Sequence, residues 1–107
     1  MKEIEYLKLS DGSSPLEDWL YDLDMSIRGR IMKRLSRLPD GNLGHHKKLT
    51  SEISELKFDF GSGYRIYYTE INNILLLLIN GGDKSSQSKD IQKAQKLLDK
   101  WKEVNHD

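Results

Sequence analysis

The chain has 107 residues, of which 32% are Asp, Glu, Lys or Arg, and this suits one well-solvated domain. It contains no cysteine, which excludes disulfides, zinc–thiolate sites and cysteine nucleophiles. The formal net charge is zero, but residues 1–27 carry −5 and residues 28–57 carry +5. Because salt screens exposed charges beyond about 10 Å, the basic segment can act locally on a polyanion. The same pattern also fits a solvated helix face.

The amino terminus lacks the basic segment and long apolar run of a signal peptide. The longest apolar run, residues 74–79, is far shorter than the roughly 20 residues that span a bilayer. We therefore expect a soluble, cytoplasmic protein that does not enter membranes.

The first forty residues predict a strand followed by two helices. Residues 3–9 are rich in strand-forming side chains. Ser14 and Pro15 supply an N-cap and a first-turn proline for a helix with apolar residues at helical spacing. A second helix is expected to start after Asp24 and to end at Pro39. Its predicted buried stripe is Ile27, Ile31, Leu35 and Leu38.

From residue 53 onwards the apolar spacing changes from helical to alternating. It predicts two strands, over residues 53–60 and 64–69, paired through the turn at residues 61–63. Each strand has one apolar face, and because both apolar faces must share the core, the polar side chains must share the other face. That polar face collects Glu55, Lys57, Asp59, Arg65 and Tyr67.

The remaining residues predict a third strand and a last helix. After a reversal at Asn72-Asn73, the continuous apolar run at residues 74–79 suits a central strand that is covered on both sides. Gly81-Gly82 is expected to break this strand, and the helix is expected to begin after Ser86. We predict one α+β domain over residues 1–107, a small antiparallel sheet packed by helices in the order β-α-α-β-β-β-α.

The predicted polar face carries groups that suit RNA cleavage. In that reaction the ribose 2′-hydroxyl attacks the adjacent phosphorus, helped by a base, a proton donor and cations. Arg65 suits the cationic role, because its planar fork binds two phosphate oxygens. Lys57 or Lys84 can neutralise charge or act as a base, and Glu55 is an alternative base. None of these steps requires a metal or another cofactor.

The same residues also fit structural roles. Lys57 and Arg65, on the polar face of a two-stranded ribbon, fit a surface cross-strand pair with Glu55 or Asp59. Tyr67 fits an ordinary strand residue, and Lys84 fits an exposed turn. Residue pattern alone therefore indicates an α+β domain with a polar face, and no more.

The order of several motifs along the chain gives more information about function than residue pattern alone. The chain reads GSGYRIYY at residues 61–68, LLLL at 75–78 and GGDKSSQ at 81–87, followed by Asp90-Ile91 and by Ala94. In this order the motifs are similar to the RelE/ParE toxin superfamily, most of all to its HigB-like branch of addiction-module killer proteins. The resemblance covers about residues 16–101.

The resemblance implies a RelE-like fold and the toxin of a type II toxin–antitoxin system. Such a toxin is a metal-independent endoribonuclease, an mRNA interferase that enters the ribosome, cleaves mRNA and inhibits translation. Its implied partners are a cognate helix-turn-helix antitoxin, the ribosome and mRNA. Two alternatives stay open, a ParE-like poison of DNA gyrase and a non-enzymatic antitoxin-binding module.

The resemblance makes Arg65 the stabiliser of the transition state and Lys84 the lysine of the GGDKS motif. Lys57 departs from the pattern, since arginine is expected there. The catalytic candidates are thus Arg65, Lys57, Lys84, Glu55 and Tyr67. The residues expected to contact RNA are Arg28, Arg30, Arg34, Lys47 and Lys48.

Overall fold

The computed structural model describes residues 1–105, so the last two residues of the predicted domain lie outside the described part. The elements within it are β1 (Glu3–Tyr6), α1 (Pro15–Tyr21), α2 (Met25–Leu35), the 3₁₀ helix η1 (Leu38–Asp40), β2 (His46–Lys48), β3 (Ser54–Phe58), β4 (Tyr64–Ile71), β5 (Leu75–Gly82), the 3₁₀ helix η2 (Lys84–Ser86) and α3 (Gln87–Asn105). None of the helices in residues 1–105 has the length and apolar character needed to cross a bilayer.

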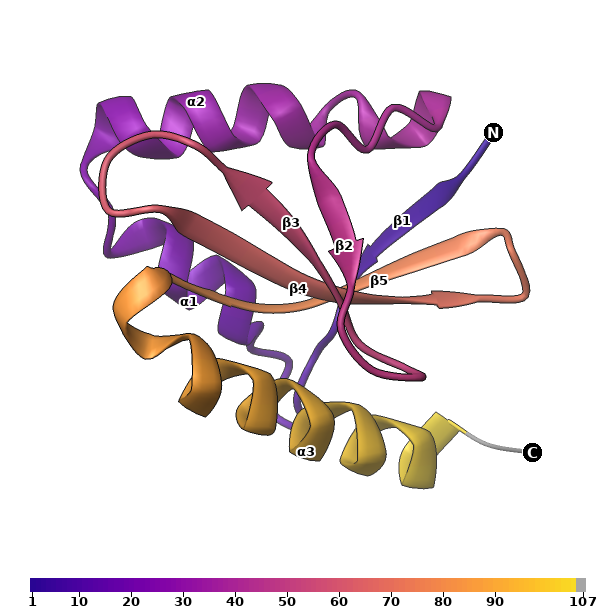
Figure 1. Ribbon diagram of the computed structural model, residues 1–107. Helices are drawn as coiled ribbons and strands as arrows, with labels where there is room; N and C mark the ends of the chain where they lie inside the picture. The colour runs from indigo at the N-terminus through magenta and orange to yellow at the C-terminus, as the bar shows by residue number, and fades with distance from the viewer. Residues whose placement is uncertain (106–107) are drawn as a thin grey trace.

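The strands form a five-stranded sheet in the order β1-β5-β4-β3-β2 (Figure 1). β1 runs parallel to β5, and the other neighbours are antiparallel. The α+β class is therefore confirmed, but the predicted order lacked β2 and the predicted sheet was wholly antiparallel. β2 was missed because its residues, His46–Lys48, are all exposed and show no apolar alternation. The parallel pairing was missed because it joins strands that are distant in sequence.

Helices cover both faces of the sheet, with α1 and α2 on one side and α3 on the other (Figure 1). β5 contributes to both cores. Leu76 and Leu78 belong to the cluster beneath α1 and α2, whereas Leu77 and Ile79 belong to the cluster beneath α3. The prediction of a strand covered on both sides is confirmed.

The predicted helix starts are also confirmed. The side chains of Ser14 and Asp24 cap α1 and α2, each accepting a hydrogen bond from a backbone N–H in the first turn. α2 ends at Leu35, short of Pro39, because Pro39 lacks the N–H that an α-helix would pair with the carbonyl of Leu35, four residues earlier. The chain continues as η1, which still buries Leu38.

The expectation that Gly81-Gly82 breaks the third predicted strand is wrong. Both glycines belong to β5, in which Gly82 pairs with Arg65. At both positions a side chain from a helix packs directly against the backbone of the strand. A Cβ atom on Gly81 would stand 2.3 Å from the Trp19 ring, and one on Gly82 would stand 1.8 Å from Oδ2 of Asp90. Glycine is required here by close packing against α1 and α3.

The reversal at Asn72-Asn73 lies as predicted between β4 and β5. Both residues have positive φ, 55° and 59°, which asparagine tolerates better than most side chains do. Two consecutive residues of this kind make the tight turn whose twist matches that of the flanking strands.

Candidate active site at the end of strands β3 and β4

The β3–β4 register brings the predicted polar residues together. Lys57 lies opposite Arg65, and Glu55 lies opposite Tyr67. Directly opposite residues of antiparallel strands point to the same face, so all four side chains share one face, as the alternation predicted. This face is not open throughout, because Tyr67 belongs to the apolar cluster beneath α3.

The part of this face that α3 leaves open holds a hollow of about 210 Å³. Three cations line it, Lys57 from β3, Arg65 from β4 and Lys84 from η2, together with Asp59. The backbone N–H of Lys84 donates to the carbonyl of Ser62, 3.3 Å away, which docks η2 onto the turn between β3 and β4. The structure therefore gathers the three predicted cations around one small space.

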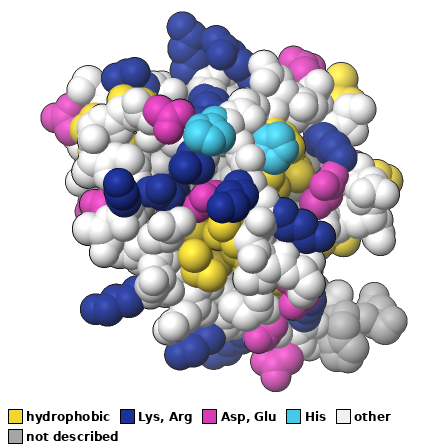
Figure 2. Space-filling view, in the orientation of Figure 1, with side chains coloured by type: hydrophobic (Ala, Val, Ile, Leu, Met, Phe, Trp, Pro, Cys, Tyr) yellow, Lys and Arg dark blue, Asp and Glu magenta, His cyan; other side chains and the backbone are white. Residues whose placement is uncertain are grey.

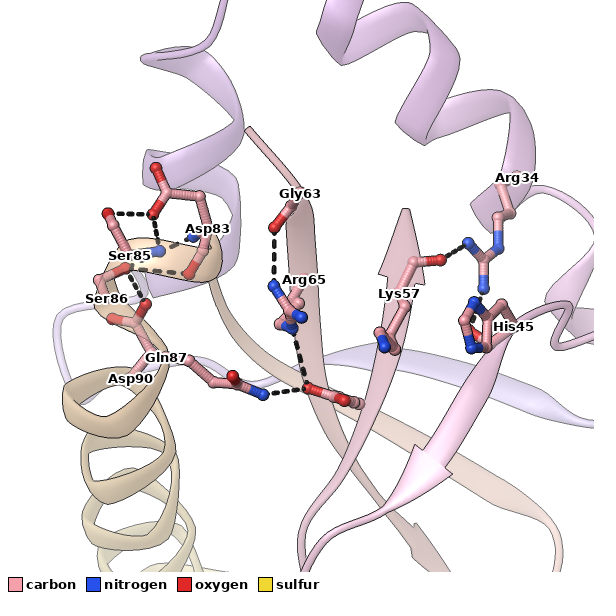
Figure 3. A network of polar contacts seen from close by, with 11 residues as sticks. Arg34, His45, Lys57, Gly63, Arg65, Asp83, Ser85, Ser86, Gln87 and Asp90 are labelled. Carbon is pink, nitrogen blue, oxygen red and sulfur yellow. Dashed lines mark hydrogen bonds and ion pairs between the residues drawn. The ribbon is translucent and has the colours of Figure 1, made fainter. Parts of the chain in front are cut away.

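The Arg65 guanidinium is held firmly in this hollow (Figure 3). Its Nη1 donates to the carbonyl of Gly63 at 3.0 Å, and its Nε lies 3.3 Å from Oε1 of Glu55. Nε makes no hydrogen bond within residues 1–105, so its contact with Glu55 is an ion pair. Arg65 is only 8% exposed, so the pairing with Glu55 is a buried ion pair and not the surface pair that strand pattern alone suggested.

Glu55 lies beneath Arg65 and is 2% exposed. Oε1 of its carboxylate also accepts a hydrogen bond from Nε2 of Gln87, at 3.0 Å, at the start of α3 (Figure 3). Gln87 ends the GGDKSSQ motif, but no feature of the sequence marks it as a partner of Glu55. The carboxylate is thus fixed from two sides, and it fixes the guanidinium in turn.

A second set of polar contacts holds the segment that carries Lys84 (Figure 3). The Asp83 carboxylate accepts hydrogen bonds from the hydroxyl and the backbone N–H of Ser85, and the Ser85 hydroxyl keeps the pKa of Asp83 below its usual value. The Ser86 hydroxyl donates to Oδ2 of Asp90 in the first turn of α3. These contacts set the position of η2 relative to α3.

Tyr67 lies apart from the hollow. Its side chain is fully buried, and its hydroxyl has no hydrogen-bond partner among residues 1–105. Burial, and then the charge of Glu55, raise the pKa of Tyr67 above its usual value. Of the five catalytic candidates, Tyr67 is the one whose surroundings are those of a core residue.

Arg34, a predicted RNA contact, makes its hydrogen bonds inside the fold. Its guanidinium donates to the carbonyls of Lys57, Leu43 and His45 and lies over the Phe58 ring, 4.4 Å from the ring centre. Burial lowers the pKa of Arg34 from its usual value. Arg34 therefore ties α2 to the ends of β2 and β3.

The other predicted RNA contacts lie at the surface. Arg28 stacks on Tyr21 and Arg30 stacks on Phe60, with 5.2 and 3.8 Å to the ring centres. Both belong to α2, which covers the sheet face opposite α3.

Lys47 and Lys48 are exposed on the edge strand β2 and point to opposite faces. Lys47 pairs with Glu55, so its side chain lies on the face of Arg65, whereas Lys48 pairs with Ser54. Figure 2 shows Lys and Arg side chains gathered on the visible face near the two histidines. Of the basic pair on β2, Lys47 is the one that extends the charge of the hollow.

The rim of the hollow carries one further pair. Nδ1 of His45 lies 2.9 Å from Oδ2 of Asp59, and this hydrogen bond lowers the pKa of Asp59. Within residues 1–105, no group of three His, Asp or Glu side chains is placed to hold a metal ion.

Comparison with known proteins places the chain among relatives. No protein-family model matches it. A Haemophilus influenzae protein, described as an uncharacterized protein, is 42% identical over 82 residues, which are 76% of this chain and 83% of the relative. The chain belongs to the family of that protein. Because the aligned segment covers 76% of the chain, it must include the middle of the chain, where the β3–β4 hairpin carries Lys57 and Arg65.

Proposed function

We propose that the protein is the toxin of a type II toxin–antitoxin system, with a RelE-like fold. In this proposal it is a metal-independent endoribonuclease that cleaves mRNA on the ribosome and inhibits translation. The observation that carries the proposal is the convergence of Arg65, Lys57 and Lys84 on one small hollow of about 210 Å³. A phosphate in this hollow would meet three cations from three different elements.

Arg65 is the group that we assign to the transition state. As the 2′-hydroxyl attacks phosphorus, negative charge builds on the phosphate oxygens, and a guanidinium stabilises that charge through directed hydrogen bonds. The contacts with Gly63 and Glu55 hold the Arg65 guanidinium in one orientation, and Arg65 lines the hollow in which a phosphate would bind. Such preorganisation supports catalysis because the cation need not reorient during the reaction.

Lys57 and Lys84 take supporting roles in this scheme. Each contributes an ammonium group to the hollow, where it neutralises charge on the phosphate and on the leaving 5′-oxygen. Glu55 is better suited to positioning Arg65 than to acting as a base, because its Oε1 already pairs with Arg65 and Gln87.

The partners and the location are proposed on the motif resemblance. The ordered motifs between residues 61 and 94 support a cytoplasmic toxin that acts on mRNA in the ribosome. They also support a cognate helix-turn-helix antitoxin that holds the toxin inactive. The exposed strand β2, with Lys47 on the side of the hollow, suits contact with a nucleic-acid backbone.

The experiment that tests this function maps mRNA 5′ ends after induction of the protein in cells, and again in vitro with and without ribosomes. We expect new 5′-hydroxyl ends within translated regions, and only when ribosomes are present. Arg65→Lys and Lys84→Ala should each lower the cleavage rate, Arg65→Lys by about 100-fold. Lys100→Ala, at an exposed position on α3, should cleave normally.

Two results would replace the proposal with an alternative. If DNA synthesis stops first while mRNA stays intact, the protein is a gyrase poison. If overproduction without any antitoxin is harmless, it is a non-enzymatic binding module.

A further inference from the structure

A second surface lies on the opposite edge of the sheet, away from the hollow around Arg65. It is a groove of about 880 Å³ between β1, α1 and α2. Its apolar lining includes Ile4, Tyr6, Leu20, Met25 and Met32. The two methionines are 75% and 43% exposed, and flexible methionines at a surface adapt to the shape of a bound apolar group.

β1 borders this groove as an edge strand. The N–H groups of Glu3 and Leu7 donate to the carbonyls of Ile74 and Leu78 on the β5 side. Backbone groups alternate in direction along a strand, so the N–H and C=O groups of the intervening even-numbered residues, 4 and 6, point away from the sheet. They form a row of donors and acceptors that one more strand can pair with.

The side chains of β1 alternate in character as well as in direction. Ile4 and Tyr6 pack against the core cluster beneath α1 and α2. Glu3 and Glu5 are exposed, and strand alternation turns their side chains to the other face, although Glu5 also borders the groove. A strand added to β1 would continue the pleat, with its apolar side chains over the groove and its other side chains next to the two glutamates.

Pairing between two copies of β1 is disfavoured by these charges. In an antiparallel pair related by two-fold symmetry, Glu5 would lie opposite Glu3 or opposite Glu5 of the second copy. Like charges directly opposite each other destabilise a sheet. The acidic face therefore selects a basic partner over a second copy of this chain.

We propose that the groove and the β1 edge bind an extended polypeptide segment in which apolar and basic residues alternate. The segment adds a sixth strand to the sheet, places its apolar side chains against Met25 and Met32, and pairs its basic side chains with Glu3 and Glu5. This site shares no residue with the hollow, so it stands or falls independently of the nuclease proposal.

The first test titrates the full chain with a short synthetic peptide of alternating valine and lysine. Two control peptides are used, one with the same residues in two blocks and one with N-methyl groups on alternate amides. We expect saturable binding of the alternating peptide alone, because only that peptide can present both the side chains and the backbone donors. Equal binding of either control peptide would overturn the proposal.

The second test measures hydrogen exchange of individual amides. Binding should slow exchange at Ile4 and Tyr6, whose N–H groups become paired, and should leave the amides around Lys57 and Arg65 unchanged. Binding without protection at the β1 edge would overturn strand addition. So would the same protection in a dimer without peptide, because a second copy would then occupy the edge.

The third test uses exposed positions that should not disturb folding. Glu5→Lys should weaken binding by about tenfold and favour a peptide that alternates valine with glutamate. Met25→Glu should weaken the binding of both peptides, since it puts a charge into the groove. Asp99→Lys, the same change of charge on α3, should have no effect. Unchanged affinity in both Glu5→Lys and Met25→Glu would sink the proposal.

Discussion

Glu55 and Arg65 form a buried ion pair at the edge of the hollow, with 3.3 Å between Oε1 and Nε. Their side chains are 2% and 10% exposed. Removing two charges from water is expensive, and a pair of this kind adds little net stability. What it does provide is a guanidinium with a fixed orientation at the edge of the hollow.

The first prediction separates the two partners of this ion pair. Glu55→Ala should lower the free energy of unfolding by about 3–5 kcal/mol, because it leaves the Arg65 charge buried and unpaired. Glu55→Gln, which keeps the shape and an acceptor oxygen, should lower it by less, about 1–2 kcal/mol. Urea unfolding measures both. The double variant Glu55→Ala/Arg65→Ala should lose much less free energy of unfolding than the sum of the two single losses. If the two losses simply add, the two residues are not coupled.

The second prediction concerns Arg34 as a structural residue. Arg34→Ala should destabilise the fold by about 2–4 kcal/mol, because three backbone carbonyls lose a charged donor. Arg30→Ala, on the same helix, should change stability much less, since Arg30 contacts the Phe60 ring at the surface. Thermal unfolding of the two variants tests this. If Arg34→Ala and Arg30→Ala were equally stable, the hydrogen bonds of Arg34 would add no more stability than the surface contact of Arg30.

The third prediction uses the two faces of β2. Lys47→Ala should weaken binding to single-stranded RNA and reduce the salt dependence by about 0.7 in log–log slope, the value for one phosphate contact. Lys48→Ala removes the same charge from the opposite face and should leave both quantities unchanged. Affinity measured across a salt series distinguishes them. Equal effects of the two substitutions would mean that the face does not matter.

The fourth prediction concerns the phenol of Tyr67. Burial raises its pKa above the ordinary value near 10, so above about pH 10 the unfolded chain loses the proton first and stability falls as pH rises. Tyr67→Phe should flatten this fall and raise stability at pH 7 by about 1 kcal/mol, because it removes a buried hydroxyl without a partner among residues 1–105.

Tyr21→Phe, at a residue that is 74% exposed, is the control for this measurement and should change neither quantity. Tyr67→Phe should also retain cleavage activity. Loss of activity in a stable Tyr67→Phe variant would return Tyr67 to the catalytic candidates.

The fifth prediction compares two glycines. Gly81→Ala should destabilise the fold by about 1–3 kcal/mol and change the fluorescence of Trp19, because the new methyl group would press on that ring. Gly29→Ala, in α2, meets nothing within 4 Å and should stabilise the helix by about 0.5–1 kcal/mol. The two changes are chemically identical, so unfolding curves isolate the effect of the surroundings. A stable Gly81→Ala variant would contradict the close packing described here.

The alternation of polar and apolar residues predicted the part of the site that depends on pairing between strands close in sequence. Lys57 and Arg65 belong to strands joined by a short turn, so the alternation of each strand and the shared core sufficed to place both on one face. The same holds for the caps of α1 and α2, where Ser14 and Asp24 act within one helical turn.

Long-range packing decided the rest. That α3 would cover Tyr67, and that Gln87 would reach Glu55, depends on how a helix crosses a sheet, which no spacing in the chain reveals. Gly81-Gly82 was misread because a glycine pair commonly ends a strand. Its actual reason, the approach of Trp19 and Asp90, exists only in the assembled fold.

The parallel pairing of β1 with β5 has a consequence for synthesis of the protein. A growing polypeptide leaves the ribosome amino end first, so Ile4 and Tyr6 emerge long before their neighbours at residues 75–78 have been made. Until then the cluster beneath α1 and α2 lacks Leu76 and Leu78, which β5 places between β1 and the rest of the sheet. A nascent chain arrested before β5 should therefore be protease-sensitive, and the sheet can be completed only after β5 has been made.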